Sequence, residues 1–207
     1  GETIAAIGAS LGRGAREIDA TGKLVLPGGI DAHAHIEQLS GMGVTNADTF
    51  ASGTSAAALG GTTTVIPFAA QHQGKSPAKV VEDYHALAAR GAVIDYAMHM
   101  IIADPTQKVL TEELPALIKS GHGSIKVFMT YEKTKIDDEQ LLDVLLAARR
   151  HKALVCVHAE NNGMISWMGR RLVEKGYRAP KYHAVYHPRL SEAEAFHRLI
   201  ACAELID

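Results

Sequence analysis

The sequence lacks an excess of positive charge, a long hydrophobic run and closely spaced cysteines. Its 207 residues carry 21 lysines and arginines against 23 aspartates and glutamates, which gives a formal net charge of −2. Without a basic excess or a basic cluster, neither nucleic acid nor a membrane surface is favoured as a partner. Small molecules are the expected partners.

Targeting and membrane signals are also missing from the pattern. No apolar run approaches the length that spans a bilayer, and the first residues show no charged region followed by a long apolar stretch. The two cysteines, Cys156 and Cys202, are far apart in apolar segments, which favours reduced thiols over a disulfide. Together these features predict a cytoplasmic protein.

What the chain does contain is typical of a globular α/β protein. Apolar residues make up 47% of it and charged residues 21%, so a sizeable core is expected. Runs rich in β-formers predict strands at residues 24–32, 62–67, 93–102, 124–129 and 153–158. Helical patterns lie between and after them, at residues 49–60, 77–91, 111–121, 137–152, 161–176 and 191–207. This alternation indicates βα units around a parallel sheet.

The first 23 residues break the alternation. GETIAAIGASL and REIDATGKLV are typical of short strands joined by glycine-rich turns, so residues 1–23 are predicted to be part of a small β-sandwich. Residues 24–207 supply about five βα units, whereas a closed (β/α)8 TIM barrel needs eight in roughly 250 residues. We therefore expect an incomplete TIM barrel. The alternative is a doubly wound sheet of five strands, complete as it stands.

Three predicted strands end in residues that bind metals. In an extended strand His33 and His35 point to the same side, although such a pair also occurs as ordinary solvated or core histidines. Lys126 lies in an otherwise apolar strand, where an ammonium is costly unless it is neutralised or paired. His158 closes a further apolar strand. Because barrel active sites lie at the carboxyl ends of the strands, these four side chains predict a metal site.

Four segments carry a family resemblance: PGGIDAHAH, DTFASGTSAAALGGTTTV, SIKVFMTYE and VHAEN. Over nearly its whole length the chain resembles the dihydropyrimidinase and D-hydantoinase branch of the cyclic amidohydrolases. Lys126 and Tyr131 fall at the family's spacing and form the most specific match. The resemblance implies a metal-dependent hydrolase on a (β/α)8 barrel, with a small β-sandwich built from both chain termini.

The resemblance also implies a centre of two divalent metal ions. His33 and His35 match ligands of the first ion, His158 matches a ligand of the second, and Lys126 matches a lysine that reacts with CO2 to form a bridging carbamate. Nearby cations lower a lysine pKa, and the neutral amine can then take up CO2. Zn²⁺ is the expected metal, with Mn²⁺, Fe²⁺ or Co²⁺ as alternatives. A sixth-strand histidine and the eighth-strand aspartate that serves as general base lie outside this sequence.

The implied reaction opens a cyclic amide with a metal-bridging hydroxide. Tyr131 would donate a hydrogen bond to the developing oxyanion, with a core tyrosine as the alternative. Phe128 and Leu39 would form an apolar wall beside the substrate, although packing alone also explains apolar residues there. Hydantoins, dihydropyrimidines, cyclic imides and allantoin all remain candidate substrates. By resemblance the protein is expected to be a homo-oligomer, a tetramer or a dimer.

Residues around the ligands have weaker expected roles. Asp31, Glu160 and Asn161 are candidates for orienting the ligands. Pro67 and Phe68 stand where many relatives carry an acidic residue after the second strand. The other histidines are expected to be structural or solvated, although the last two could line the mouth of the pocket: His72, His85, His99, His122, His151, His197, His183 and His187.

A function of another class is also considered. Relatives of this family include metal-free scaffold proteins that assemble with partners in cytoskeletal regulation. Those relatives lack most of the metal ligands, whereas four of the six expected ligands are present in this sequence. Ligand retention therefore favours catalysis.

Overall fold

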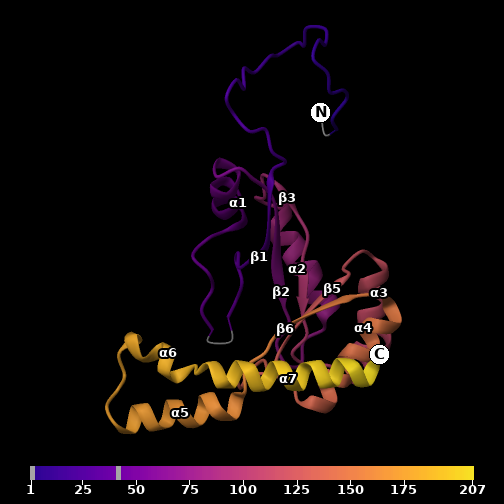
Figure 1. The fold of residues 1–207 in the computed structure, drawn as a ribbon. Helices are drawn as coiled ribbons and strands as arrows, with labels where there is room; N and C mark the ends of the chain where they lie inside the picture. Colours follow the sequence, from indigo (N-terminus) through magenta and orange to yellow (C-terminus); the bar gives the residue numbers. More distant parts are fainter. Residues whose placement is uncertain (1–2, 41–42) are drawn as a thin grey trace.

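One parallel sheet organises the chain. The structure, a computed structural model, describes residues 3–40 and 43–207 (Figure 1). Its strands are β1 (Gly29–Ala34), β2 (Thr62–Ala70), β3 (Asp95–Tyr96), β4 (His99–Ile101), β5 (Ser124–Phe128) and β6 (Leu154–His158). They pair in the order β1-β2-β4-β5-β6, with β3 beside β2, and every named pair is parallel. Because this order follows the chain without a reversal, the doubly wound alternative is wrong and the partial (β/α) barrel is confirmed.

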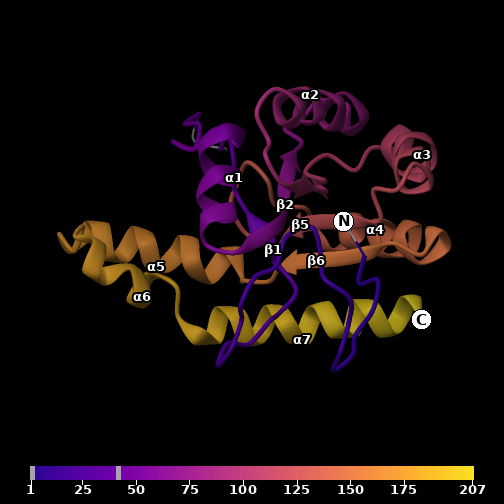
Figure 2. The same cartoon turned by 90° about the horizontal axis from the view of Figure 1, so that it is seen from above.

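Helices follow the strands. They are α1 (Phe50–Leu59), α2 (Pro77–Ala89), α3 (Leu114–Lys119), α4 (Asp138–His151), α5 (Asn162–Glu174), α6 (His183–Tyr186) and α7 (Arg189–Ile206), with a π-helical turn η1 (Val109–Glu113) and a 3₁₀ turn η2 (Pro180–Tyr182). Figure 2 shows α1 to α4 following one another around one side of the strands. The main core lies between these helices and the sheet, and its members include Phe50, Met100, Leu114, Ile125 and Leu141.

Local signals set most helix ends as predicted. Ser76 accepts a hydrogen bond from the Lys79 N–H at the start of α2, where Pro77 occupies the first helical position. Asp137 caps α4 in the same way. For α1 the cap is Thr49, and the carboxylate of the preceding Asp48 accepts from the Ser52 hydroxyl. The ends of these helices were therefore largely readable from the sequence.

Alternation along β5 separates the two faces of the sheet. Ile125 and Val127 pack into the core under the helices, so Lys126 and Phe128 point to the opposite, inner face. In the sheet register Lys126 lies beside Cys156 of β6, and Phe128 lies beside His158. The inner face therefore carries the chemistry-bearing residues, and the outer face carries the core.

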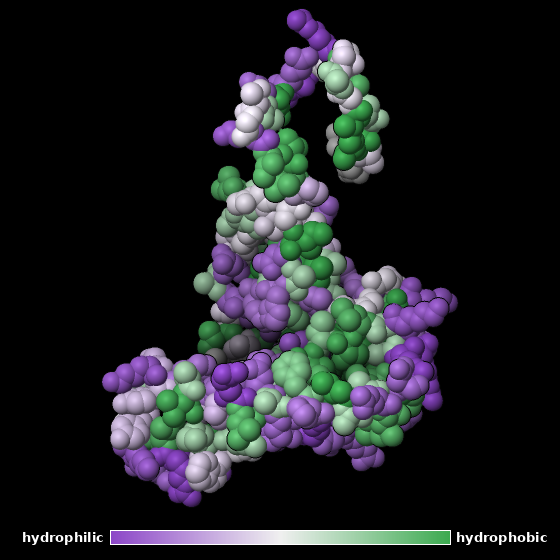
Figure 3. Space-filling view, in the orientation of Figure 1, coloured by the Kyte–Doolittle hydropathy of each residue, from purple (hydrophilic) through white to green (hydrophobic). Residues whose placement is uncertain are grey.

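The N-terminal segment differs from its prediction. Residues 3–28 form no strand, and they extend away from the sheet (Figure 1). The large apolar side chains of this segment are exposed, including Ile4, Ile7, Leu24, Val25 and Leu26. In Figure 3 the segment shows green, hydrophobic residues among white and purple ones. A strand needs a partner for its N–H and C=O groups, and the described residues pair none with this segment. The β-sandwich over residues 1–23 stays a prediction.

Several predicted boundaries are also corrected. The first strand begins at Gly29 rather than at residue 24, after Pro27, which has no N–H to donate. The predicted strand 93–102 is split into β3 and β4. Strand β2 runs on to Ala70, so Pro67 and Phe68 lie inside it. The β1–β2 ladder is irregular before Ala34, the partner of Pro67, and such irregularities accommodate proline in a sheet.

The predicted helix 111–121 is not one regular α-helix. It starts as the turn η1 and continues as α3, with Pro115 in the first turn of α3. Cys156 and Cys202 are free and half-buried. Among the helices formed by the described residues, none has both the length and the apolar character needed to cross a bilayer.

A buried threonine allows a test of the packing of α1. The Thr54 side chain is fully buried, and its hydroxyl donates to the Phe50 carbonyl at 2.5 Å and accepts from the Val93 N–H at 3.1 Å. Thr54→Val keeps the shape but leaves the Val93 N–H unpaired, so the free energy of unfolding in urea should fall by about 1–3 kcal/mol. The control is Thr111→Val, which removes an exposed hydroxyl bonded to Gln107. Equal stability of the two variants would contradict this role.

Candidate metal centre and substrate cavity

The two histidines at the end of β1 lie together as predicted. His33 lies within β1 and His35 just beyond it, with ring centroids 5.3 Å apart. Gln38 Oε1 lies 2.6 Å from His35 Nδ1, which leaves the Nε2 of that ring open. Asp31 accepts a hydrogen bond from the backbone N–H of His33, not from its ring. Asp31 therefore shapes the strand end but does not orient the imidazole.

Lys126 is buried without a compensating charge. Only 7% of the residue is exposed, and its Nζ lies 5.2 Å from the ring centre of Phe128 and 5.9 Å from that of Phe68. Within the part of the chain that the structure describes, no ion pair joins it to a carboxylate. Burial lowers the pKa of Lys126 below its ordinary value. Lowering the pKa favours the neutral amine, which is the form that can react with CO2.

Phe68 connects the histidine pair to the lysine. Its ring centre lies 4.7 Å from that of His33 and 4.9 Å from those of His35 and His99. Burial lowers the pKa of His33, and the charges of Lys126, His35 and His99 lower it further. The lowered pKa favours the neutral imidazole that binds metals. The place of Phe68 was not expected, because β2 was predicted to end before it.

His99 is structural, in agreement with the expectation. Its Nε2 lies 2.9 Å from the carbonyl oxygen of Ala32, and its Nδ1 lies 2.5 Å from the hydroxyl of Ser124. Both ring nitrogens are thus engaged with neighbouring strand residues. His99 joins β4 to β1 and β5.

His158 is the last residue of β6, which pairs with β5 on the side opposite to β4. Its Nε2 lies 2.6 Å from Glu160 Oε2, and Glu160 Oε1 lies 2.8 Å from His187 Nδ1. Burial alone raises the pKa of Glu160, but hydrogen bonds from His158 and His187 outweigh burial and lower it overall. Glu160 is therefore a carboxylate in contact with a candidate ligand. The sequence offered no signal for the contact with His187, which lies between α6 and α7.

Asn161 has another role. Its Oδ1 accepts from the Met164 N–H and caps α5, and its Nδ2 donates to Glu194 at 2.5 Å. Both polar atoms of the side chain are thus occupied by α5 and α7. The expectation that Asn161 orients a ligand is not supported by these contacts.

Tyr131 combines an unusual backbone with a polar side chain. Its φ of +70° lies in the left-handed region, which is uncommon for a tyrosine and concentrates at functional sites. The residue is 44% exposed, so the core-tyrosine alternative is wrong. Its hydroxyl lies 3.4 Å from His158 Nε2. Burial, followed by Glu160 and Tyr186, raises the pKa of Tyr131 and keeps the hydroxyl protonated as a donor.

A cavity of about 630 Å³ lies at this end of the sheet. Leu39, Phe128 and Tyr131, the three residues expected to face a substrate, all line it. Other residues that line it were not predicted from the sequence, among them Gln71, His72, Ile165 and Tyr186. The volume and the mixed apolar and polar lining suit a small organic ring.

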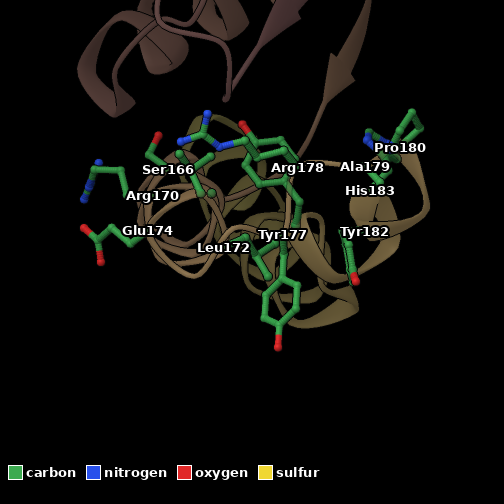
Figure 4. A pocket seen from close by; sticks show the side chains of 13 residues that line it. Ser166, Arg170, Leu172, Glu174, Tyr177, Arg178, Ala179, Pro180, Tyr182 and His183 are labelled. Carbon is green, nitrogen blue, oxygen red and sulfur yellow. The ribbon is translucent and has the colours of Figure 1, made fainter.

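A second hollow of about 940 Å³ opens outside this site, between α5 and the segment after it. In Figure 4, Ser166, Arg170 and Leu172 of α5 lie on one side, and Pro180, Tyr182 and His183 lie on the other. Ser166 and Tyr186 line both hollows, so these two residues lie between them. His183 faces this outer hollow and not the cavity beside Tyr131.

The donors fit a metal centre only when Lys126 is included. The described residues contain no group of three or more His, Cys, Asp and Glu side chains placed to hold a metal ion. They do place three imidazoles and one buried amine on β1, β5 and β6. A carbamate on Lys126 would add anionic oxygen donors to the imidazole nitrogens, which is a donor set that suits Zn²⁺.

The model of the amidohydrolase family matches residues 24–190. The chain belongs to the amidohydrolase family. It is 44% identical to the D-hydantoinase of Ralstonia pickettii over 99% of this chain, and 45% identical to that of Geobacillus stearothermophilus over 98%. These similarities assign it to the dihydropyrimidinase and hydantoinase branch.

The solved structures agree with this assignment. Dihydropyrimidinase from Brevibacillus agri superposes on 97% of this chain with a TM-score of 0.92 and 40% identity. The matched part is 44% of that amidohydrolase chain, and it is 44% and 43% of the two curated D-hydantoinases. The chain thus spans less than half the length of the relatives it matches.

Replacing the buried lysine tests its energetic cost. In the full-length amidohydrolase stripped of metal, Lys126→Met should raise the free energy of unfolding at neutral pH by about 1–3 kcal/mol, because it removes a buried amine that has no ion-pair partner among the described residues. The folded pKa is lowered from 10.5, so wild-type stability should rise with pH between the two pKa values, and the Met variant should lose this rise. Urea unfolding at several pH values measures the stability gain and its pH dependence, and the exposed Lys119→Met is the control. If Lys126→Met were only as stable as wild type, burial of the amine would not destabilise the protein.

Proposed function

We propose that the full-length protein containing this chain hydrolyses a ring amide, with hydantoins and dihydropyrimidines as the substrate class. One observation carries the proposal. The candidate ligands His33, His35, Lys126 and His158 lie in or just after β1, β5 and β6, in the sheet whose carboxyl end carries the cavity lined by Leu39, Phe128 and Tyr131. The names of the similar proteins, D-hydantoinase and dihydropyrimidinase, support the same substrate class.

The proposed cofactors are two divalent cations, with Zn²⁺ as the expected metal. His33 and His35 would hold one cation, His158 the other, and a CO2-derived carbamate on Lys126 both. When bound, such cations supply hydroxide near neutral pH and polarise the carbonyl group of the substrate. The burial of Lys126 serves this arrangement because it favours the neutral amine over the ammonium.

The remaining residues bind and orient the ring. The Tyr131 hydroxyl, kept protonated, donates a hydrogen bond to the oxygen that gains negative charge as the amide carbon becomes tetrahedral. Leu39 and Phe128 cover the apolar part of the ring and exclude water. The protein is further proposed to be a cytoplasmic homo-oligomer, a dimer or a tetramer.

The direct test is ring opening by the full-length protein. Hydantoin and dihydrouracil should both be examined, with the N-carbamoyl amino acid product measured by chromatography. Chelation should abolish turnover and Zn²⁺, Co²⁺ or Mn²⁺ should restore it. Lys126→Ala should lose metal and at least about 100-fold in activity, with partial rescue by acetate or propionate. Turnover without metal, or full activity of Lys126→Ala, would contradict the proposal, and a metal-free, inactive wild type would favour the scaffold alternative.

Tyr131 gives a separate prediction. Tyr131→Phe removes only the hydroxyl, so kcat should fall by about 10²–10³-fold while KM changes by a few-fold and metal content stays the same. Steady-state kinetics and elemental analysis measure these quantities. Tyr177→Phe, which lies at the outer hollow, is the matched control. A kcat within about twofold of wild type would exclude Tyr131 as an oxyanion donor.

A further inference from the structure

One carboxylate bridges two imidazoles beside the candidate metal centre. Glu160 Oε2 lies 2.6 Å from His158 Nε2, and Glu160 Oε1 lies 2.8 Å from His187 Nδ1. The side chains of Glu160 and His187 are only 16% and 13% exposed, and that of His158 is 33% exposed. The three groups therefore form a largely buried chain that leads away from the site.

The geometry of this chain assigns the nitrogen of His158 that faces the metal. A carboxylate accepts hydrogen bonds and cannot donate them, so the proton of the neutral His158 ring is assigned to Nε2. The lone pair is then on Nδ1, which is the only nitrogen left for a metal ion. Carboxylates that fix the tautomer and orientation of a metal-binding histidine in this way strengthen metal affinity.

His187 is itself held by packing. It follows α6 and precedes Pro188, the N-cap residue of α7, and its ring centre lies 4.4 Å from that of Tyr186 in an edge-on contact. The Tyr186 ring packs on Gly169 of α5 so closely that a Cβ at Gly169 would lie 2.5 Å from it. The position of His187 is thus fixed by α5 and by the start of α7. It is not set by the metal site.

We propose that Glu160 and His187 are positioning residues that hold His158 with Nδ1 toward the metal, so that the segment carrying Tyr186 is linked to the metal centre. This inference rests on the metal site of the proposed function. His187 holds the carboxylate, and the carboxylate holds the ligand ring. Because Tyr186 lines the substrate cavity, the cavity wall and the ligand share one anchor.

Variants of the full-length protein separate the hydrogen bonds from packing. Glu160→Gln leaves one acceptor oxygen for two rings. His187→Asn keeps an N–H close to the position of Nδ1, whereas His187→Leu, of similar size, removes it. His183→Leu is the matched control, because the His183 ring lies tilted against that of His187, with centres 4.5 Å apart, but makes no hydrogen bond to Glu160 among the described residues.

The readouts are the Zn²⁺ dissociation constant, measured by chelator competition, and the visible spectrum of the Co²⁺-loaded protein. Glu160→Gln should weaken Zn²⁺ binding by about 10–100-fold and His187→Leu by several-fold, with altered Co²⁺ bands in both. His187→Asn and His183→Leu should stay within about twofold of wild type. Glu160→Gln combined with His187→Leu should be no weaker than Glu160→Gln alone, because the two residues act in series.

Other outcomes would overturn the proposal. One is a wild-type Zn²⁺ affinity and Co²⁺ spectrum in both Glu160→Gln and His187→Leu. Another is an equal loss of Zn²⁺ affinity in His187→Asn and His187→Leu. The third is a wild-type protein that binds no metal. A variant that fails to fold is replaced by Glu160→Asp, which shortens the side chain and should also weaken Zn²⁺ binding. A wild-type protein that binds metal but opens no cyclic amide would overturn only the proposed function, since neither readout uses turnover.

Discussion

The buried amine of Lys126 is the constraint around which the site is arranged. Ile125 and Val127 need the core beneath the helices, and the pleat of β5 then forces Lys126 and Phe128 to the inner face. An ammonium there has aromatic neighbours and no ion pair within the described residues. Such a position is costly while the amine is charged, so the burial of Lys126 opposes folding unless the amine is neutral.

Parallel pairing puts the other groups on one side of the sheet. Parallel strands end at the same edge of a sheet, so residues far apart in the chain lie along one edge where β1, β5 and β6 stop. Tyr131 follows β5 in a left-handed conformation that the surrounding structure must hold in place. The cavity lining therefore comes from both sources, because Phe128 belongs to β5 whereas Leu39 and Tyr131 lie in segments that follow β1 and β5.

Much of this arrangement was predictable from the sequence. The strand–helix alternation, the caps Ser76 and Asp137 and the ligand-type residues at strand ends are local patterns, and the structure has them in place. The N-terminal strands are not formed, because a strand depends on a partner that local pattern does not supply. Pro67 was taken as an end of β2, whereas an irregular ladder beside it lets the strand continue.

By itself the sequence determined the element types, the inner-face position of Lys126 and the residue types at the strand ends, because each depends on neighbours within a few positions. Only the tertiary structure decided the sequential strand order, the ring of Phe68 between the histidine pair and Lys126, and the contact of His187 with Glu160. These features join segments that are far apart in the sequence. No local periodicity encodes them, since they arise when separate helices and strands pack on one sheet.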